Sequence, residues 1–239
     1  MSQTPLKRFY KTVSILETEA GWAIALDDRP MRTPANQPLC VPTSLLAEII
    51  AQEWDRQSSQ INMHAMTLTR MANVALDRTP SQRPDMIGEF VRYCETDLLC
   101  FPDTQPADLA QTQNQLWAPI RDWAACTLSI DLKVNQESLI ALDHPPKSLE
   151  AARQYAAGYD DFMLTGLLYG TSLFGSALLA SAVLESHLDT DTAHRAAILP
   201  ELFQMQNWGQ DEEMQAVLDA KQTEAQNLGL YVNSLKKKS

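Results

Sequence analysis

The chain has 239 residues, of which 45% are hydrophobic, so it has enough apolar side chain to bury a core, and intrinsic disorder is excluded as a description of the whole chain. Lys and Arg total 19 against 30 for Asp and Glu, a formal charge of -11, which disfavours nucleic acid and anionic membrane surfaces as partners. The small number of glycines, 8 against 13 prolines, argues against a doubly wound nucleotide-binding fold.

The first part of the chain alternates between apolar and polar residues, which is typical of short strands. The alternation runs from Phe9 to Ile15 and again from Trp22 to Leu26. Glu19-Ala20-Gly21 can supply the turn between these strands, and Asp27-Asp28 the turn that follows. Several prolines then divide the segment up to residue 42 into short, edge-like pieces. The sequence therefore predicts a small antiparallel β unit.

From residue 42 onward the apolar residues recur at helical spacing. A first helix is predicted behind a Ser/Thr cap, with Leu45, Leu46, Ile49, Ile50 and Trp54 on one stripe. Four more are predicted: over 66–76, after a Thr79 cap with Pro80 at the first helical position, around 109–123 with a kink or break at Pro119, and after Pro145-Pro146. We expect an α+β fold with a β-rich α+β domain at residues 1–77 and a helical domain at residues 78–239.

An uncharged run from Phe162 to Leu184 is long enough to cross a bilayer and contains Gly166-x-x-x-Gly170, a spacing used by membrane helix pairs. Its Ser, Thr and Gly residues, the absence of flanking Lys or Arg and the chain's mean hydropathy of -0.25 favour a different interpretation. We expect two consecutive buried helices of a bundle, broken near Gly170-Thr171. A membrane-associated protein is the alternative.

The residues that usually carry chemistry are scattered. Cys40, Cys94, Cys100 and Cys126 contain no C-x-x-C, and we expect them to be reduced core residues. The four histidines form no metal-binding spacing, and the chain lacks the motifs of a nucleophile elbow, a phosphate loop or a dinucleotide loop. We therefore expect no catalytic residues, no metal and no cofactor. The start of the chain lacks a signal or transit pattern, so we expect a cytoplasmic or an already processed protein.

Negative charge gathers in the helical part of the chain. Residues 1–77 hold 7 basic and 8 acidic side chains, net -1, which leaves 12 and 22, net -10, for residues 78–239. Near the end of the chain, Gly209 can end a helix after Trp208, and Asp211-Glu212-Glu213 can begin the next. On local grounds, these carboxylates stabilise a helix N-terminus. Because they gather with a tryptophan at a predicted surface bend, this corner is also the candidate binding site.

Several blocks of the sequence, taken in order, carry a resemblance to one family. They are Arg8-Phe9-Tyr10-Lys11, Leu26 to Pro34, Ala51 to Gln57, Met66 to Arg70, Glu95 to Cys100, and Phe203-Gln204 with Trp208-Gly209 and Glu212. Over residues 6 to 235 the chain resembles the assembly chaperones of the F(1) sector of ATP synthase that bind the free alpha subunit. It departs from the family pattern at a few positions, among them Asp28, Pro200, Gln210 and Gln215.

The resemblance implies a non-enzymatic protein with an N-terminal β-containing domain and a C-terminal helical bundle of orthogonal type. It implies that the chain, as a monomer without membrane insertion, holds the alpha subunit until the beta subunit replaces it. The partner-binding residues would be Trp208, Asp211, Glu212 and Glu213, in a bacterial cytoplasm or a mitochondrial matrix. The alternative is an enzyme of unfamiliar type, which would show a deep cleft with convergent polar groups and shifted pKa values.

Overall fold

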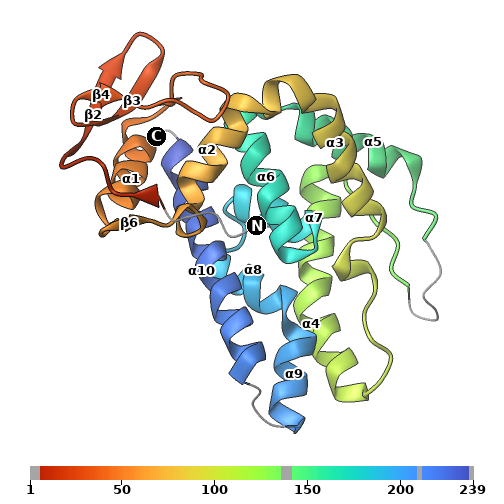
Figure 1. Ribbon diagram of the computed structural model, residues 1–239. Coiled ribbons are helices and arrows are strands. Elements are labelled where there is room, and N and C mark those ends of the chain that lie inside the picture. Colours follow the sequence, from red (N-terminus) through yellow and green to blue (C-terminus); the bar gives the residue numbers. More distant parts are fainter. Residues whose placement is uncertain (1–5, 136–141, 209–211, 237–239) are drawn as a thin grey trace. The chain divides into compact units, whose positions relative to one another are not determined.

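A hairpin opens the fold of the computed structural model, which describes residues 6–135, 142–208 and 212–236 (Figure 1). Strands β2 (Val13–Thr18) and β3 (Gly21–Leu26) pair antiparallel, as the alternation predicts. Asp27 and Asp28 have φ of 47° and 64°, the positive values that a two-residue hairpin turn requires, and the chain then enters β4 (Arg29–Pro30). The predicted antiparallel β unit is therefore confirmed.

A helix closes one side of this small sheet. Strand β5 (Cys40–Val41) adds to β3, and α1 (Ser44–Asp55) packs against β2, β3 and β5. The hydroxyl of Thr43 accepts a hydrogen bond from the amide of Leu46 at 3.2 Å, which confirms the predicted cap. A separate pair of short strands, β1 (Leu6–Lys7) and β6 (Gln60–Ile61), lies outside this sheet.

The next two helices are nearly continuous. Helix α2 (Thr67–Asp77) follows a short turn, η1 (Met63–Ala65), and α3 (Thr79–Glu95) begins after a single intervening residue. The hydroxyl of Thr79 donates back to the carbonyl of Val74 and meets the hydroxyl of Thr165 at 2.8 Å. Thr79 thus lies inside the helix that it was predicted to cap.

The rest of the described chain is almost entirely helical. Its elements are η2 (Leu98–Cys100), α4 (Ala107–Trp123), the π-helical turn η3 (Ala124–Leu128), α5 (Pro146–Ala157), α6 (Asp161–Phe174), α7 (Ala177–Leu184), α8 (Thr190–Ala197), α9 (Leu199–Trp208) and α10 (Glu212–Leu235). Helix α4 continues through Pro119 and packs against α7, α8 and α9 (Figure 1). The predicted α+β fold is confirmed.

The uncharged run forms two helices, but its break differs from the prediction. Helix α6 continues through Gly170 and ends before Gly175, which has φ of 63°. A Cβ at Gly170 would lie 2.8 Å from Leu228 Cδ2 and 3.2 Å from Ala180 Cβ, so this glycine allows close packing instead of a turn. Within the described residues, no helix is both long and apolar enough to span a bilayer.

The chain divides into two compact units that do not follow the sequence order. Unit 1 consists of Met1–Arg83, Asp161–Thr165 and Leu230–Ser239, and unit 2 of Pro84–Asp160 and Gly166–Gly229. The domain boundary between residues 77 and 78 stays a prediction.

The four cysteines are free, as expected, but they do not share one environment. Cys94 and Cys100 are buried and Cys40 is half-buried, whereas Cys126 is exposed on the π-helical turn η3. The prediction that all four are core residues is therefore wrong for Cys126. Its neighbours in sequence are small or polar, and the turn leaves its side chain in water.

Candidate functional site

The acidic corner predicted from the sequence lies between α9 and α10. Trp208 is the last residue of α9, and Glu212 and Glu213 are exposed in the first turn of α10. Asp211, Gly209 and Gln210 lie outside the described residues. The structure therefore brings two of the three predicted carboxylates together at a helix N-terminus, where negative charge is stabilised by the helix dipole.

A groove of about 620 Å³ runs along the same helix α9 within unit 2. Leu202 and Phe203 of α9 contribute to it from one side and Leu109 and Leu116 of α4 from the other, and Arg195 of α8 also lines it. Phe203 belongs to the block that the sequence analysis placed next to the acidic corner. Helix α9 therefore contributes an aromatic side chain to an open groove, a feature enriched in protein-binding surfaces, and the next helix begins with exposed carboxylates.

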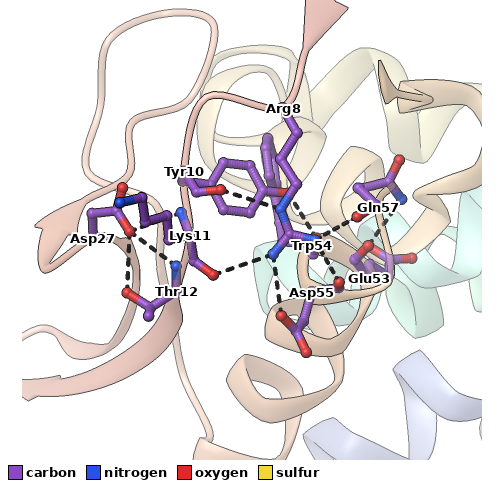
Figure 2. A network of polar contacts seen from close by, with 9 residues as sticks. All are labelled: Arg8, Tyr10, Lys11, Thr12, Asp27, Glu53, Trp54, Asp55 and Gln57. Carbon is purple, nitrogen blue, oxygen red and sulfur yellow. Dashed lines mark hydrogen bonds and ion pairs between the residues drawn. The ribbon is translucent and has the colours of Figure 1, made fainter. Parts of the chain in front are cut away.

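A second polar network, in unit 1, is built around Arg8 (Figure 2). Its guanidinium donates to the carbonyls of Asp55 at 2.9 Å, of Tyr10 at 3.2 Å and of Gln57, and its Nη2 lies 3.4 Å from the Asp55 carboxylate. The same guanidinium lies 4.6 Å from the centre of the Tyr10 ring. Arg8 therefore fixes the N-terminal segment against the end of α1.

Two further hydrogen bonds extend this network. The Tyr10 hydroxyl donates to the carbonyl of Trp54 at 2.6 Å, and burial is the largest cause that raises the pKa of Tyr10. The Asp27 carboxylate accepts from the amides of Lys11 and Thr12, both at 2.9 Å (Figure 2). These bonds lower the pKa of Asp27, so it is ionised at neutral pH.

Two carboxylates, the half-buried Glu53 and the buried Asp97, serve as helix caps. Glu53 accepts from the amides of Leu68 and Thr69 at the start of α2, both at 2.8 Å. Asp97, which is fully buried, accepts from the amides of Leu99 and Leu178, both at 3.0 Å. Burial raises the pKa of Asp97 to about 6. Each carboxylate satisfies amides that have no partner within their own helix.

The described residues show no group of three or more His, Cys, Asp or Glu side chains that could hold a metal ion. His144 is buried, and its Nδ1 accepts from the amide of Lys133 at 3.0 Å, while burial lowers its pKa. The shifted pKa values at Asp97 and His144 therefore come from burial of two side chains whose hydrogen-bond partners lie within the fold.

The Arg8 network was not predicted as a feature from spacing. Its signal in the sequence is the block Arg8-Phe9-Tyr10-Lys11, but its acceptors lie at residues 55 and 57, far along the chain. Periodicity and local motifs report neighbours on one element, so they cannot pair Arg8 with the end of a helix that begins at Ser44.

Comparisons with known proteins all find relatives of one kind. A family model described as "ATP12 chaperone protein" matches residues 7–125. The crystal structure of Atp12 from Paracoccus denitrificans is similar with 35% identity and a TM-score of 0.89, covering 97% of this chain and 99% of that one. Mitochondrial atp12 of Schizosaccharomyces pombe is 23% identical, covering 89% of this chain and 77% of its own length. Mitochondrial ATP12 of Saccharomyces cerevisiae is 26% identical, covering 87% of this chain and 77% of its own length.

Proposed function

The chain belongs to the ATP12 chaperone family, and from this premise we propose that it assists assembly of the F(1) sector of ATP synthase by binding the unassembled alpha subunit. The observation that carries the proposal is the chain-long similarity to Atp12 from Paracoccus denitrificans. The bound alpha subunit would be released when the beta subunit takes its place, in a bacterial cytoplasm or a mitochondrial matrix.

The physical task suits a protein without a reactive centre. An unassembled subunit exposes the apolar and charged interface that it will later bury against its neighbours, and such a surface self-associates in water. A chaperone needs only a complementary surface of moderate strength, with a few aromatic anchors and a polar rim. The groove along α9 offers one aromatic side chain, Phe203, among leucines and polar residues, and the exposed Glu212 and Glu213 begin the helix that follows α9.

The test is to mix this chain separately with purified alpha and beta subunits and to separate the mixtures by gel filtration. We expect a complex of one chain with one alpha subunit, and none with beta. Suppression of alpha-subunit aggregation, followed by light scattering, should saturate at the same ratio. A complex with beta alone, or with neither subunit, would refute the proposal.

Within this function we assign partner binding to Trp208, Asp211, Glu212 and Glu213. The support is that Glu212 and Glu213 are exposed on the first turn of α10, where they can accept charge-assisted hydrogen bonds from Arg or Lys of the client. If Glu212 interacted only with the helix dipole, it would contribute about 0.3–1 kcal/mol to the stability of the fold and nothing to the affinity for the alpha subunit.

The substitution Glu212→Lys separates these two roles. We expect a folded protein whose affinity for the alpha subunit falls at least about tenfold, or roughly 1.4 kcal/mol. Glu212→Gln tests loss of charge without reversal, and Glu89→Lys on α3, which is also exposed, is the matched control. An affinity of Glu212→Lys within a factor of two of the original would remove Glu212 from the binding site.

An enzyme of unfamiliar type remains the competing proposal. An enzyme would need convergent polar groups with shifted pKa values in a cleft, whereas the half-buried Glu53 and the buried Asp97 cap helices. If the chain were such an enzyme, its catalytic activity would persist after the acidic corner is changed. Turnover of any small molecule by a Glu212→Lys protein that no longer binds the alpha subunit would favour it.

A further inference from the structure

A pocket in unit 1 is the feature that the proposed function leaves unused. It has a volume of about 540 Å³ and shares Tyr10, Asp27 and Trp54 with the network of Figure 2. We call it the N-terminal pocket. The residues that carry the argument are four apolar side chains and two cations, namely Leu6, Phe9, Met31, Trp54, Arg29 and Arg32.

The apolar part of the pocket stands open to water. Phe9 is 66% exposed and Leu6 is 55% exposed, whereas Trp54, at 5%, forms a buried part of the lining. Phe9 is held in place, because Arg8 is pinned on one side of it and its ring meets that of Tyr10 edge-on at 5.4 Å on the other. An exposed aromatic side chain on a fixed backbone loses little entropy on binding, which suits an interface anchor.

The charged part of the pocket is positive in a protein of net charge -11. Arg29 and Arg32 are both exposed, and within the described part of the chain neither forms an ion pair. Arg32 donates to the carbonyl of Asn36 at 2.8 Å, which orients the side chain without neutralising it. The one acid in the lining, Asp27, accepts three hydrogen bonds from Lys11 and Thr12 through Oδ1, so two cations stand against one carboxylate in this lining.

We propose that the N-terminal pocket binds a segment of the client polypeptide in which an aromatic or aliphatic side chain lies next to Asp or Glu. The apolar side chain packs against Phe9, Met31 and Trp54, and the carboxylate accepts hydrogen bonds from Arg29 and Arg32. The identification of the bound chain as a client rests on the proposed function. The client would then meet two surfaces of opposite charge, since the acidic corner attracts basic groups.

The decisive variant is the double reversal Arg29→Glu/Arg32→Glu. We expect its affinity for the purified alpha subunit to fall at least tenfold, and the loss to shrink at high salt. The matched control is Lys147→Glu/Arg153→Glu on α5, which makes the same change in net charge at exposed positions and should bind within twofold of the unchanged chain. Phe9→Ser is the second variant. Because the exposed side chain of Phe9 contributes little to the core, the circular dichroism of this variant should match that of the unchanged chain.

A peptide experiment tests the pocket independently of the client. The probe is a synthetic peptide with one Trp flanked by Glu residues, together with a version in which Gln replaces every Glu. We expect the full chain to bind the Glu peptide at least tenfold more tightly, and this preference to disappear in Arg29→Glu/Arg32→Glu. The inference would be overturned if the unchanged chain bound the two peptides equally well. It would also be overturned if the double variant bound the Glu peptide as tightly as the unchanged chain does.

These outcomes separate the two proposals. If the unchanged chain fails to bind the alpha subunit but prefers the Glu peptide, the proposed function fails and the chemistry of the pocket stands. If it binds the alpha subunit and the double variant binds equally well, the pocket fails and the function stands. A different outcome of sedimentation would be that the unchanged chain and the control variant self-associate and that the double variant does not. This result would assign the pocket to a second copy of the chain and refute the proposal that it binds a client segment.

Discussion

Replacing Asp97 by Asn should change the stability of the protein in a way that depends on pH. The Asp97 carboxylate is buried without a basic partner bonded to it, and it accepts from the amide of Leu178 through one oxygen and from Ser176 and Leu99 through the other. Burial raises its pKa from 3.8 to about 6, so the folded protein binds the proton more tightly than the unfolded chain does. Its favourable contribution is therefore complete below the unfolded pKa and is lost as the pH rises through about 6.

The magnitude follows from the two pKa values. Between pH 7 and about pH 4.5, protonation of Asp97 should raise the free energy of unfolding by about 2 kcal/mol relative to a variant without this group. Asn cannot accept at both positions, so either the amide of Leu178 or the donors of Leu99 and Ser176 lose their acceptor, at a cost of about 1–3 kcal/mol for an unsatisfied buried donor. At pH 7 this cost is offset in part because the variant buries no charge.

The assay is urea unfolding, followed by circular dichroism, of the unchanged chain and of Asp97→Asn at both pH values. We expect the stability difference to be small at pH 7 and larger by about 2 kcal/mol at pH 4.5. Asp189→Asn is the control, because this exposed cap accepts from the Thr192 amide and that bond lowers the pKa of Asp189. The difference in free energy of unfolding between the unchanged chain and Asp189→Asn should be the same at the two pH values. A difference for Asp97→Asn that is constant, or greater at pH 7, would refute the reasoning.

Two further substitutions test the cap at α2 and the first hairpin. Glu53→Gln should lower the free energy of unfolding by about 1–3 kcal/mol, since one amide oxygen cannot replace both carboxylate oxygens for the donors of α2; chemical denaturation measures it, and an unchanged midpoint would contradict it. Gly21→Ala should cost at least about 2 kcal/mol, because Gly21 has φ of 123° and a Cβ there would lie 2.5 Å from the Val41 oxygen. Gly88→Ala in α3 is its control in the same thermal melts, and we expect it to be neutral or stabilising, so equal losses would argue against the strain.

Local signals in the sequence predict local structure well. The Thr43 cap, the alternation of β2 and β3 and the turn at Asp27-Asp28 each depend on residues within one or two turns of the chain, and all are found. The break in the uncharged run was placed at the wrong glycine. Gly170 and Gly175 look alike in sequence, and only the approach of Leu228 and Ala180 to the first shows which of them packs and which turns.

The candidate binding surfaces could be predicted only in part. The acidic corner was found because its carboxylates are adjacent in sequence, and two of them do lie on the first turn of one helix. The N-terminal pocket gathers residues from positions 6 to 54, whose sides face one another only after α1 has packed on the sheet. The exposure of Phe9 could not be predicted either, because the sequence places it in a strand-like alternation of apolar and polar residues.

The composition of unit 1 has a consequence for the order of events during synthesis. This unit includes Leu230–Ser239, where the buried Tyr231 donates to the carbonyl of Phe162 at 3.1 Å and the hydroxyl of Thr43 donates to the carbonyl of Ser234 at 2.8 Å. A ribosome releases the N-terminal residues first, yet they cannot complete this unit until the last ones have emerged. Nascent chains that stop before residue 230 should therefore remain sensitive to protease within the first 83 residues, and full-length chains should become resistant there only after release.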